Sequence, residues 1–391
     1  MSEAARKQPM AVETSLEQGQ AGGLLTINLD ALTANWRTLR DRAQSAECAA
    51  VVKADGYGIG LEPAMRALAR AGCKTFFVAH LSEAARARAV SAGATIYVLN
   101  GLLPGTADAF AEQALRPVLG SRDEIGEWAA FCRGGGGRLP AAIHVDTGMN
   151  RLGLPTEEAL ALAGDPLLSA FEPALLMSHL VSAEAPDDPA NARQIAAFAR
   201  VREAFGRIPA SLANSSGIFL PQRPHYDLVR PGYALYGGNP TPGSPNPMRP
   251  VVRLEARILQ FRTVEAGETA GYNGTWTAPS RRRLATLSAG YADGFLRAGS
   301  ATDVKACAGT PTGEAIVASR RCPLAGRISM DLISVDVTGL PDSAVRRGDL
   351  VTLIGDDLTI DEVGERAGTI GYEILTSLGR RYARTYSGAS I

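Results

Sequence analysis

One lysine lies where a reactive amine could act. Lys53 follows the apolar run Ala50-Val51-Val52 and precedes Ala54-Asp55-Gly56-Tyr57-Gly58. A lysine withdrawn from water has a lowered pKa, so its neutral amine can condense with an aldehyde. The nearby glycines let the backbone approach a bulky cofactor. Lys53 could instead extend its charge into solvent from a strand end, and this segment alone leaves both interpretations open.

Polar residues and glycines also follow later apolar runs of the chain. Asn214-Ser215 and Gly232-Tyr233 occupy such positions. Loops of this kind supply backbone N–H groups that cradle phosphate, and the hydroxyl groups of Ser215 and Tyr57 could add donors. Ser215 could equally cap a helix.

Four further side chains have both a chemical and a structural interpretation. Arg230 could pair with a carboxylate at a strand end. A histidine after a strand, such as His179, is more often structural than catalytic. Arg151 could be a surface residue at a helix N-terminus. Tyr291 lies in a strand that runs into a turn and could belong to a core or an interface.

The elements that must position these residues alternate between short apolar runs and amphipathic stretches from Leu24 to about residue 238. A strand at Leu25–Leu29 leads into a helix capped by Asn28 or Asp30. Further strands are predicted at Ala49–Lys53, Thr75–Ala79, Thr95–Leu99, Arg116–Leu119, Ala141–Asp146, Ala174–Ser178, Ser211–Ala213 and Asp227–Val229. About eight strand–helix units imply a (β/α)8 TIM-type barrel, and its chemistry lies at the carboxyl ends of the strands.

A second domain is predicted after a linker over residues 239–250, which is rich in proline. Residues 251–391 read as a C-terminal, mainly β domain, and residues 1–23 as a flexible tail. Strands are predicted at Val251–Phe261, Arg283–Leu287, Leu332–Val337 and Asp349–Ile354. A helix is predicted at Asp361–Ala367 with Thr359 or Asp361 as its cap, and residues 372–384 are expected to be helical and then extended.

Composition excludes several classes of function. The 391 residues are 46% hydrophobic and 20% charged, with 40 basic and 40 acidic residues, so no net field favours nucleic acid or an anionic membrane. The five cysteines are scattered, which suggests neither a zinc site nor a disulfide framework. There is no hydrophobic signal segment and no run of about 18 apolar residues, so we expect a cytoplasmic protein.

The chain resembles alanine racemases in a series of motifs that follow the family's order from about residue 24 to residue 385. The motifs are Val51–Gly58, Asp146–Gly153, Met177–His179, Asn214-Ser215, Val229–Tyr233, Gly290–Gly294, Gly326–Asp331 and Gly371–Glu373. The resemblance implies a pyridoxal-phosphate (PLP) enzyme with the cofactor on Lys53. It implies an activity that interconverts L-alanine and D-alanine. Supply of D-alanine for peptidoglycan is the expected role, and alanine catabolism stays open as the alternative.

The resemblance also implies roles for individual residues. The residues matching the family's phosphate ligands are Tyr57, Ser215, Gly232, Tyr233 and Tyr372, and Asn214 is a further expected cofactor-binding residue. His179 matches a residue beside the cofactor ring, and Arg151 matches one that contacts the cofactor hydroxyl and the substrate carboxylate. Arg230 matches the arginine that faces the pyridine nitrogen, where a permanent charge keeps that nitrogen unprotonated and favours racemisation.

A second base is implied at Tyr291, which in the family acts from the partner subunit on the substrate face opposite Lys53. Met330 comes from the partner in the same way, so a homodimer with shared active sites is expected. Lys53 would serve the D-enantiomer and Tyr291 the L-enantiomer.

The sequence departs from many members of the family at His144. Their lysine at this position is modified to a carbamate that positions the arginine corresponding to Arg151. Histidine cannot form that stable carbamate, so we expect no carbamylated lysine here. Another anion or side chain would then hold Arg151, or Arg151 is oriented differently.

Three alternatives remain. A PLP decarboxylase of the same architecture would place an acidic residue, not Arg230, opposite the pyridine nitrogen, and a reactive cysteine where Tyr291 stands. A non-catalytic PLP-binding protein would be a single barrel and would leave residues 251–391 unexplained. A racemase for another amino acid, such as serine, could differ at one or two pocket residues.

Overall fold

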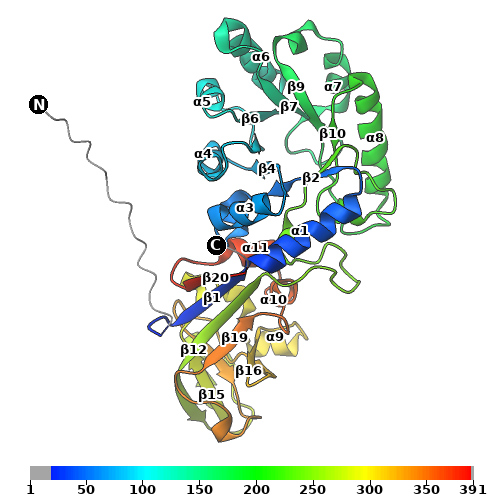
Figure 1. Ribbon diagram of the computed structural model, residues 1–391. Helices are drawn as coiled ribbons and strands as arrows, with labels where there is room; N and C mark the ends of the chain where they lie inside the picture. Colours follow the sequence, from blue (N-terminus) through cyan, green and yellow to red (C-terminus); the bar gives the residue numbers. More distant parts are fainter. Residues whose placement is uncertain (1–18, 389–391) are drawn as a thin grey trace, which may run out of the picture.

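The computed structural model describes residues 19–388, which form a parallel barrel and a second, mainly antiparallel sheet (Figure 1). The barrel takes up most of the blue-to-green part of the chain, and the second sheet lies beneath it in the figure. Of the predicted tail, residues 1–18 lie outside the described residues. No helix within residues 19–388 combines the length and the apolar character needed to cross a membrane.

The barrel is built from eight strand positions, of which β2 and β3 share one. Its strands are β2 (Glu47–Cys48), β3 (Ala50–Val51), β4 (Thr75–Val78), β5 (Thr95–Val98), β6 (Arg116–Leu119), β7 (Pro140–Asp146), β9 (Glu172–Met177), β10 (Ala210–Ser211) and β11 (Leu228–Val229). Parallel pairing runs from β3 through β7 and β9 to β10. The ring closes because β11 pairs with β2, and the Arg230 N–H donates to the Ala213 carbonyl at 2.9 Å. The predicted (β/α)8 barrel is confirmed, and its strands end at one common mouth.

Helices surround this barrel because each buries one apolar stripe against the strands. They are α1 (Leu29–Ala43), α3 (Leu61–Arg70), α4 (Leu81–Val90), α5 (Ala107–Glu112), α6 (Arg122–Phe131), α7 (Thr156–Leu162) and α8 (Pro189–Phe205), and the short strand β8 (Leu154–Pro155) pairs with β7. The Asn28 side chain caps α1 by accepting the Ala31 N–H at 2.9 Å. Asn28, not Asp30, is therefore the cap.

The first predicted strand belongs to the other sheet. β1 (Gly23–Asn28) pairs antiparallel with β12 (Val252–Val264) and parallel with β20 (Ala383–Ser387). The sequence predicted Leu25–Leu29 as the first strand of the barrel. The structure shows that this strand belongs to the second sheet. The alternating burial of β1 predicts a strand, but not its partners, because those are supplied by residues more than 200 positions away.

The second domain is organised around β12, which pairs with β1, β15 and β19. Its other strands are β13 (Thr269–Ala270), β14 (Trp276–Thr277), β15 (Arg282–Leu287), β16 (Glu314–Val317), β17 (Arg320–Pro323), β18 (Ile333–Asp336) and β19 (Leu350–Ile354), and its helices are α9 (Asp303–Cys307), α10 (Ile360–Arg366) and α11 (Gly371–Ser377). Its mainly β character is as predicted, whereas α9 and the β16–β17 hairpin were not predicted. Thr359 is the cap of α10, because its hydroxyl accepts the Glu362 N–H at 3.2 Å.

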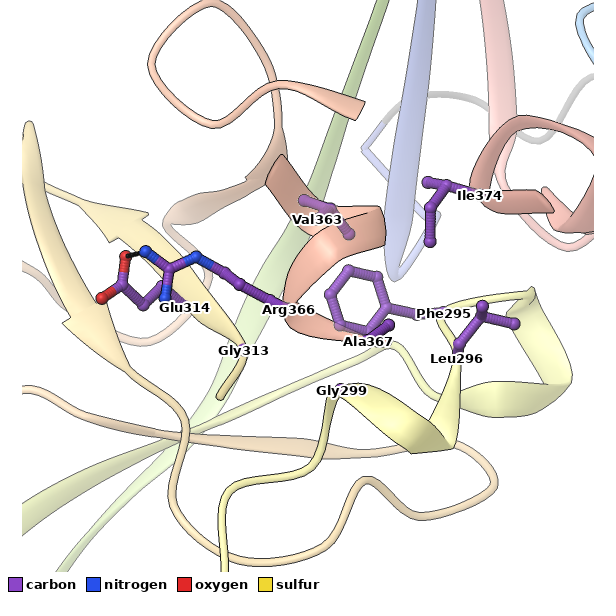
Figure 2. Close-up of a pocket in the computed structure, with 9 residues that line it drawn as sticks. All are labelled: Phe295, Leu296, Gly299, Gly313, Glu314, Val363, Arg366, Ala367 and Ile374. Carbon is purple, nitrogen blue, oxygen red and sulfur yellow. Dashed lines mark ion pairs between the residues drawn. The ribbon is translucent and has the colours of Figure 1, made fainter. Parts of the chain in front are cut away.

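A small, mostly apolar cavity lies in this domain beside α10 and α11 (Figure 2). The Phe295 ring points into it between Val363 and Ala367, and Ile374 of α11 borders it. Gly299 and Gly313 line the cavity as well. These two glycines differ in the space that surrounds them, which gives a test of the packing.

Gly299→Ala is expected to raise the apparent melting temperature, and Gly313→Ala to lower it. A methyl group at Gly299 would lie 3.6 Å from Ile328 Cδ1, an ordinary contact. Glycine-to-alanine changes at compatible positions stabilise proteins by about 0.4–1 kcal/mol. A methyl group at Gly313 would come within 2.6 Å of the Gly299 carbonyl oxygen. Thermal unfolding of both variants beside the unmodified protein is the measurement, and shifts of the same sign would contradict this packing.

Candidate active site

Lys53 lies two residues beyond β3, at the barrel mouth. It begins the short segment α2 (Lys53–Tyr57), and its side chain is partly buried. Burial lowers the pKa of the Lys53 amine, the charge of Arg151 lowers it further, and Glu83 partly offsets both effects. A larger neutral fraction makes this amine a better nucleophile and a better proton acceptor.

Arg151, His144, His179 and Arg230 share the electrostatic environment of Lys53. Burial, followed by the charge of Arg230, lowers the pKa of His144 to about 4 and that of His179 to about 3. The charges of Arg151 and Lys53 also act on His179. Both imidazoles are therefore neutral at pH 7, and the three cations give the barrel mouth a positive field that suits anionic groups.

Arg230 is buried where β11 ends, with 4% of its surface exposed. Its guanidinium donates to the Ser211 hydroxyl and, at 2.5 Å, to the Ser178 carbonyl. Burial lowers the pKa of Arg230 to about 9, which leaves it charged at neutral pH. Within residues 19–388 no carboxylate forms an ion pair with Arg230, so its charge is available to a group in the barrel mouth.

A small cradle follows β10 and β11. The Ser215 hydroxyl accepts the N–H groups of Gly232 at 3.0 Å and Ala234 at 3.2 Å. A Cβ atom at Gly232 would lie 2.2 Å from the Tyr57 hydroxyl, so only glycine lets that phenol approach the loop. Burial raises the pKa of Tyr57, which keeps its hydroxyl a neutral donor. Asn214 shapes the same loop by accepting the Gly217 N–H at 2.8 Å.

Tyrosines from both domains pack beside this cradle. The rings of Tyr233 and Tyr372 stack with centroids 3.8 Å apart, and Tyr57 stacks on Tyr236 at 4.5 Å. Tyr372 comes from α11 of the second domain, so both domains of one chain build this end of the site. The Tyr233 hydroxyl donates to Asp361 at 2.6 Å, which commits that phenol to α10. The hydroxyl of Tyr233 is therefore already engaged within the chain, which does not support a contact of that hydroxyl with phosphate.

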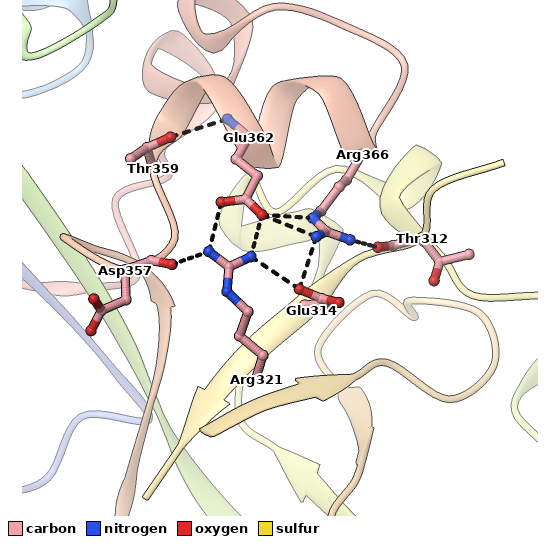
Figure 3. A network of polar contacts seen from close by, with 7 residues as sticks. All are labelled: Thr312, Glu314, Arg321, Asp357, Thr359, Glu362 and Arg366. Carbon is pink, nitrogen blue, oxygen red and sulfur yellow. Dashed lines mark hydrogen bonds and ion pairs between the residues drawn. The ribbon is translucent and has the colours of Figure 1, made fainter. Parts of the chain in front are cut away.

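An ionic network fixes α10, the helix that carries Asp361 (Figure 3). Arg366 pairs with Glu314 at 2.9 Å and with Glu362 at 3.0 Å. Arg321 of β17 pairs with the same two carboxylates, as Figure 3 shows. Because the network ties α10 to β16 and β17, it holds Asp361 against Tyr233 and thereby steadies the loop after β11.

Tyr291 and Met330 lie on the surface of the second domain. Their exposed fractions are 41% and 52%, high for such side chains. Their segments are paired, because the Tyr291 N–H donates to the Ser329 carbonyl and the Ala292 N–H to the Met330 carbonyl, each at 3.0 Å. Within residues 19–388 the Tyr291 hydroxyl has no hydrogen-bond partner. One chain thus brings Lys53, Arg151, His179 and Arg230 together but leaves Tyr291 and Met330 facing outward.

Arg381 joins the two segments that carry these residues. Its guanidinium donates to both carboxylate oxygens of the buried Asp293, at 2.6 and 2.8 Å, and to Asp331 at 2.7 Å. In the sequence, Asp293 and Asp331 stand out only as members of the motifs Gly290–Gly294 and Gly326–Asp331, and no motif contains Arg381. A bidentate pair between distant positions leaves no local spacing signal.

Two other supporting residues were missed for the same reason. Gln194 of α8 is buried, and its amide donates to the His179 carbonyl at 2.9 Å and to the Thr147 hydroxyl at 3.2 Å. Glu83 of α4 accepts N–H groups from the turn after Lys53. Only the position of Glu83 in the first turn of a helix could have drawn attention to it.

His144 lies in β7, and its pKa is lowered mainly by burial and by Arg230, with a smaller contribution from the charge of Arg151. Asp146 shapes the loop to Arg151 by accepting the N–H groups of Gly148 and Met149 at 2.8 Å each. Besides Lys53, the described lysines are Lys74, before β4 at the opposite end of the barrel, and Lys305, in α9 of the second domain. Among residues 19–388, neither of these two lysines lies near Arg151. That the protein carries no carbamylated lysine stays a prediction.

Comparison with known proteins identifies the family. The family model for the alanine racemase N-terminal domain matches residues 27–240, and that for the alanine racemase C-terminal domain matches residues 251–386. An alanine racemase of Methylobacterium sp. (strain 4-46) is 65% identical over 365 residues, covering 93% of this chain and 98% of that protein. A catabolic alanine racemase of Agrobacterium fabrum is 47% identical over 379 residues, covering 96% and 95%.

A solved structure agrees with these sequences. The crystal structure of alanine racemase from Bartonella henselae with covalently bound pyridoxal phosphate has a TM-score of 0.87 and 40% sequence identity, and the match covers 94% of this chain and 100% of that one. The agreement extends over both domains, and the chain therefore belongs to the alanine racemase family.

Proposed function

We propose that this chain is a PLP-dependent alanine racemase that interconverts L-alanine and D-alanine by a two-base mechanism. Membership of the family makes it an amino-acid racemase. The observation that carries the substrate and cofactor assignment is the grouping of Lys53, with its lowered pKa, beside Arg151 and the buried Arg230 in one barrel mouth.

The residues of the site fit PLP. The cradle of Ser215 and Gly232 brings the hydroxyl groups of Ser215 and Tyr57 to one place, and both can donate to a phosphate. Tyr372 borders the cradle through its stack on Tyr233. Lys53 would hold the cofactor covalently, as in the Bartonella henselae structure, with His179 beside the ring. When bound, PLP supplies an electron sink that acidifies the α-hydrogen of an attached amino acid.

The side chains of the protein would then position the substrate and move its proton. Arg151 binds the substrate carboxylate, which fixes the α-carbon between two bases. Once the amine of the substrate has taken its place on the cofactor, the freed Lys53 amine would remove or return the α-proton on one face, and Tyr291 of the partner subunit would do so on the other. Lys53 serves the D-enantiomer and Tyr291 of the partner subunit the L-enantiomer. The charge of the buried Arg230 would disfavour protonation of a ring nitrogen of the cofactor, which would limit side reactions such as transamination.

A homodimer with shared sites follows from this assignment. Tyr291, Met330 and Leu332 expose 41%, 52% and 41% of their surfaces on one domain of a single chain. Clustered exposure of this kind marks an interaction surface. We infer that this surface meets the barrel mouth of a second copy, so that each site takes Lys53 from one chain and Tyr291 and Met330 from the other.

A racemisation assay over a panel of L-amino acids, with PLP present, tests the proposed function. We expect the highest kcat/KM for alanine, with serine and larger substrates well below it. A higher value for serine would contradict the alanine assignment, and the absence of racemisation across the panel would contradict the reaction itself.

The physiological proposal is that the enzyme supplies D-alanine for peptidoglycan. Loss of the gene should then create a growth requirement for D-alanine, and growth without it would favour a catabolic role. A cytoplasmic location remains a prediction of the sequence.

A further inference from the structure

The chain turns in an uncommon direction directly after Lys53. Ala54, Asp55, Gly56 and Tyr57 have φ values of 54°, 55°, 63° and 52°, so they form a left-handed helical turn. Each non-glycine residue in this conformation costs free energy, and a run of them persists only if surrounding contacts impose it. The turn fixes both the direction in which Lys53 leaves β3 and the place of Tyr57.

One carboxylate meets the start of this turn. Glu83 Oε1 accepts the N–H of Ala54 at 2.6 Å and that of Asp55 at 3.4 Å. Glu83 Oε2 accepts the N–H of Ala79 at 2.8 Å and that of His80 at 3.2 Å. The side chain therefore bridges the loops after β3 and β4, and an ionised carboxylate, which only accepts, suits four donors.

Other contacts hold the turn through the side chain of Asp55 and through Gly58, the residue that follows it. Arg86 pairs with Asp55 at 2.5 Å, and Arg384 of β20 donates to the Gly58 carbonyl at 2.7 Å. Neither of them contacts the backbone of Ala54, the residue next to Lys53. Within residues 19–388, Glu83 is the side chain that binds this N–H group.

We propose that Glu83 is a positioning residue for Lys53, whose carboxylate braces the left-handed turn and so holds the lysine in the barrel mouth. The proposal rests on the proposed function for the chemistry that Lys53 performs. The role proposed for Glu83 is to restrict the backbone of the loops after β3 and β4, and it requires no contact with the substrate.

The barrel contains a matched control for this brace. Glu124 of α6 makes the same bridge two strands further on, accepting the Leu102 N–H after β5 at 2.9 Å and the Gly120 N–H after β6 at 2.8 Å. A substitution at Glu124 thus removes an equivalent bridge between loops without touching the turn after Lys53. Its comparison with Glu83 separates a positioning role from a general contribution to stability.

The experiment compares Glu83→Gln, Glu83→Asp and Glu124→Gln in the purified full-length enzyme carrying PLP. Amide hydrogen exchange is followed at Ala54 and Asp55, and PLP release is followed by absorbance. Glutamine offers one accepting oxygen and adds donors, so we expect exchange at Ala54 and PLP release each to accelerate about tenfold in Glu83→Gln. Aspartate keeps the charge but is one methylene shorter, so Glu83→Asp should also lose the contact with Ala54.

Glu124→Gln should speed exchange at Leu102 and Gly120 while leaving exchange at Ala54 and PLP release unchanged. Unaltered exchange at Ala54 in Glu83→Gln would overturn the proposal, as would PLP release in Glu124→Gln as fast as in Glu83→Gln. The proposal would also be overturned if Glu83→Asp showed the same exchange at Ala54 and the same PLP release as the unmodified enzyme. That result would show that the negative charge of Glu83 matters and its contact with Ala54 does not. Hydrogen exchange does not depend on turnover, so a failed alanine assay would count against the proposed function alone.

Discussion

Lys53→Ala is expected to abolish the visible absorbance of the covalently bound cofactor and to reduce racemisation by at least about 10⁴-fold, since the change removes a covalent anchor and a proton-transfer group together. The expectation follows from the position of Lys53, partly buried at the barrel mouth with a pKa lowered by burial and by Arg151. Absorbance spectra and a racemisation assay at saturating alanine are the measurements.

Lys74→Ala is the control for this change. Lys74 precedes β4 at the opposite end of the barrel, so its loss should alter neither absorbance nor activity. Retention of the cofactor absorbance in Lys53→Ala would assign the covalent link to another amine. Equal losses in both lysine variants would point to general instability instead of a role in the site.

Tyr291→Phe is expected to leave PLP binding intact and to reduce racemisation by about 10²–10⁴-fold, the usual contribution of a positioned acid or base. Phenylalanine keeps the ring that the second domain exposes and removes only the hydroxyl group. The loss should be largest for removal of the proton from L-alanine, the step assigned to Tyr291. In D2O, exchange of the α-hydrogen of D-alanine should therefore persist through Lys53, while exchange from L-alanine is lost.

Tyr226→Phe is the matched control, because Tyr226 packs edge-on against Phe198 and precedes β11 at the far end of the barrel. Its loss of a hydroxyl should leave racemisation unchanged. Full activity of Tyr291→Phe would contradict the two-base mechanism. Exchange that persists from L-alanine and is lost from D-alanine would reverse the assignment of the two bases.

Mixing the two inactive variants tests whether Tyr291 acts across a dimer. A dimer with one Lys53→Ala chain and one Tyr291→Phe chain would hold one site with both bases intact. Random reassociation of equal amounts should therefore restore about a quarter of the activity of the unmodified enzyme. No recovery, despite dimers that contain both chains, would show that Tyr291 does not serve its partner's site.

The sequence by itself predicted the alternation of strands and helices in the barrel and placed Lys53 at the end of one of those strands. Apolar runs at Thr75–Ala79 and Arg116–Leu119 coincide closely with β4 and β6, because a strand buried on both faces leaves a continuous local signal. Repetition of such strands predicted the barrel. The placement of Lys53 at its mouth then followed, since parallel strands all end on the same side.

Only the tertiary structure decided which distant groups meet. It assigned β1 to the second sheet, paired the Tyr233 hydroxyl with Asp361, and joined Glu83 to the turn after Lys53. Each of these contacts links residues from different elements, and a hydrogen bond across space imposes no periodicity on the sequence at either end. The resemblance to a family therefore indicated the chemistry of Lys53, which its own segment left open, whereas the contacts that hold it in place were visible only in the folded chain.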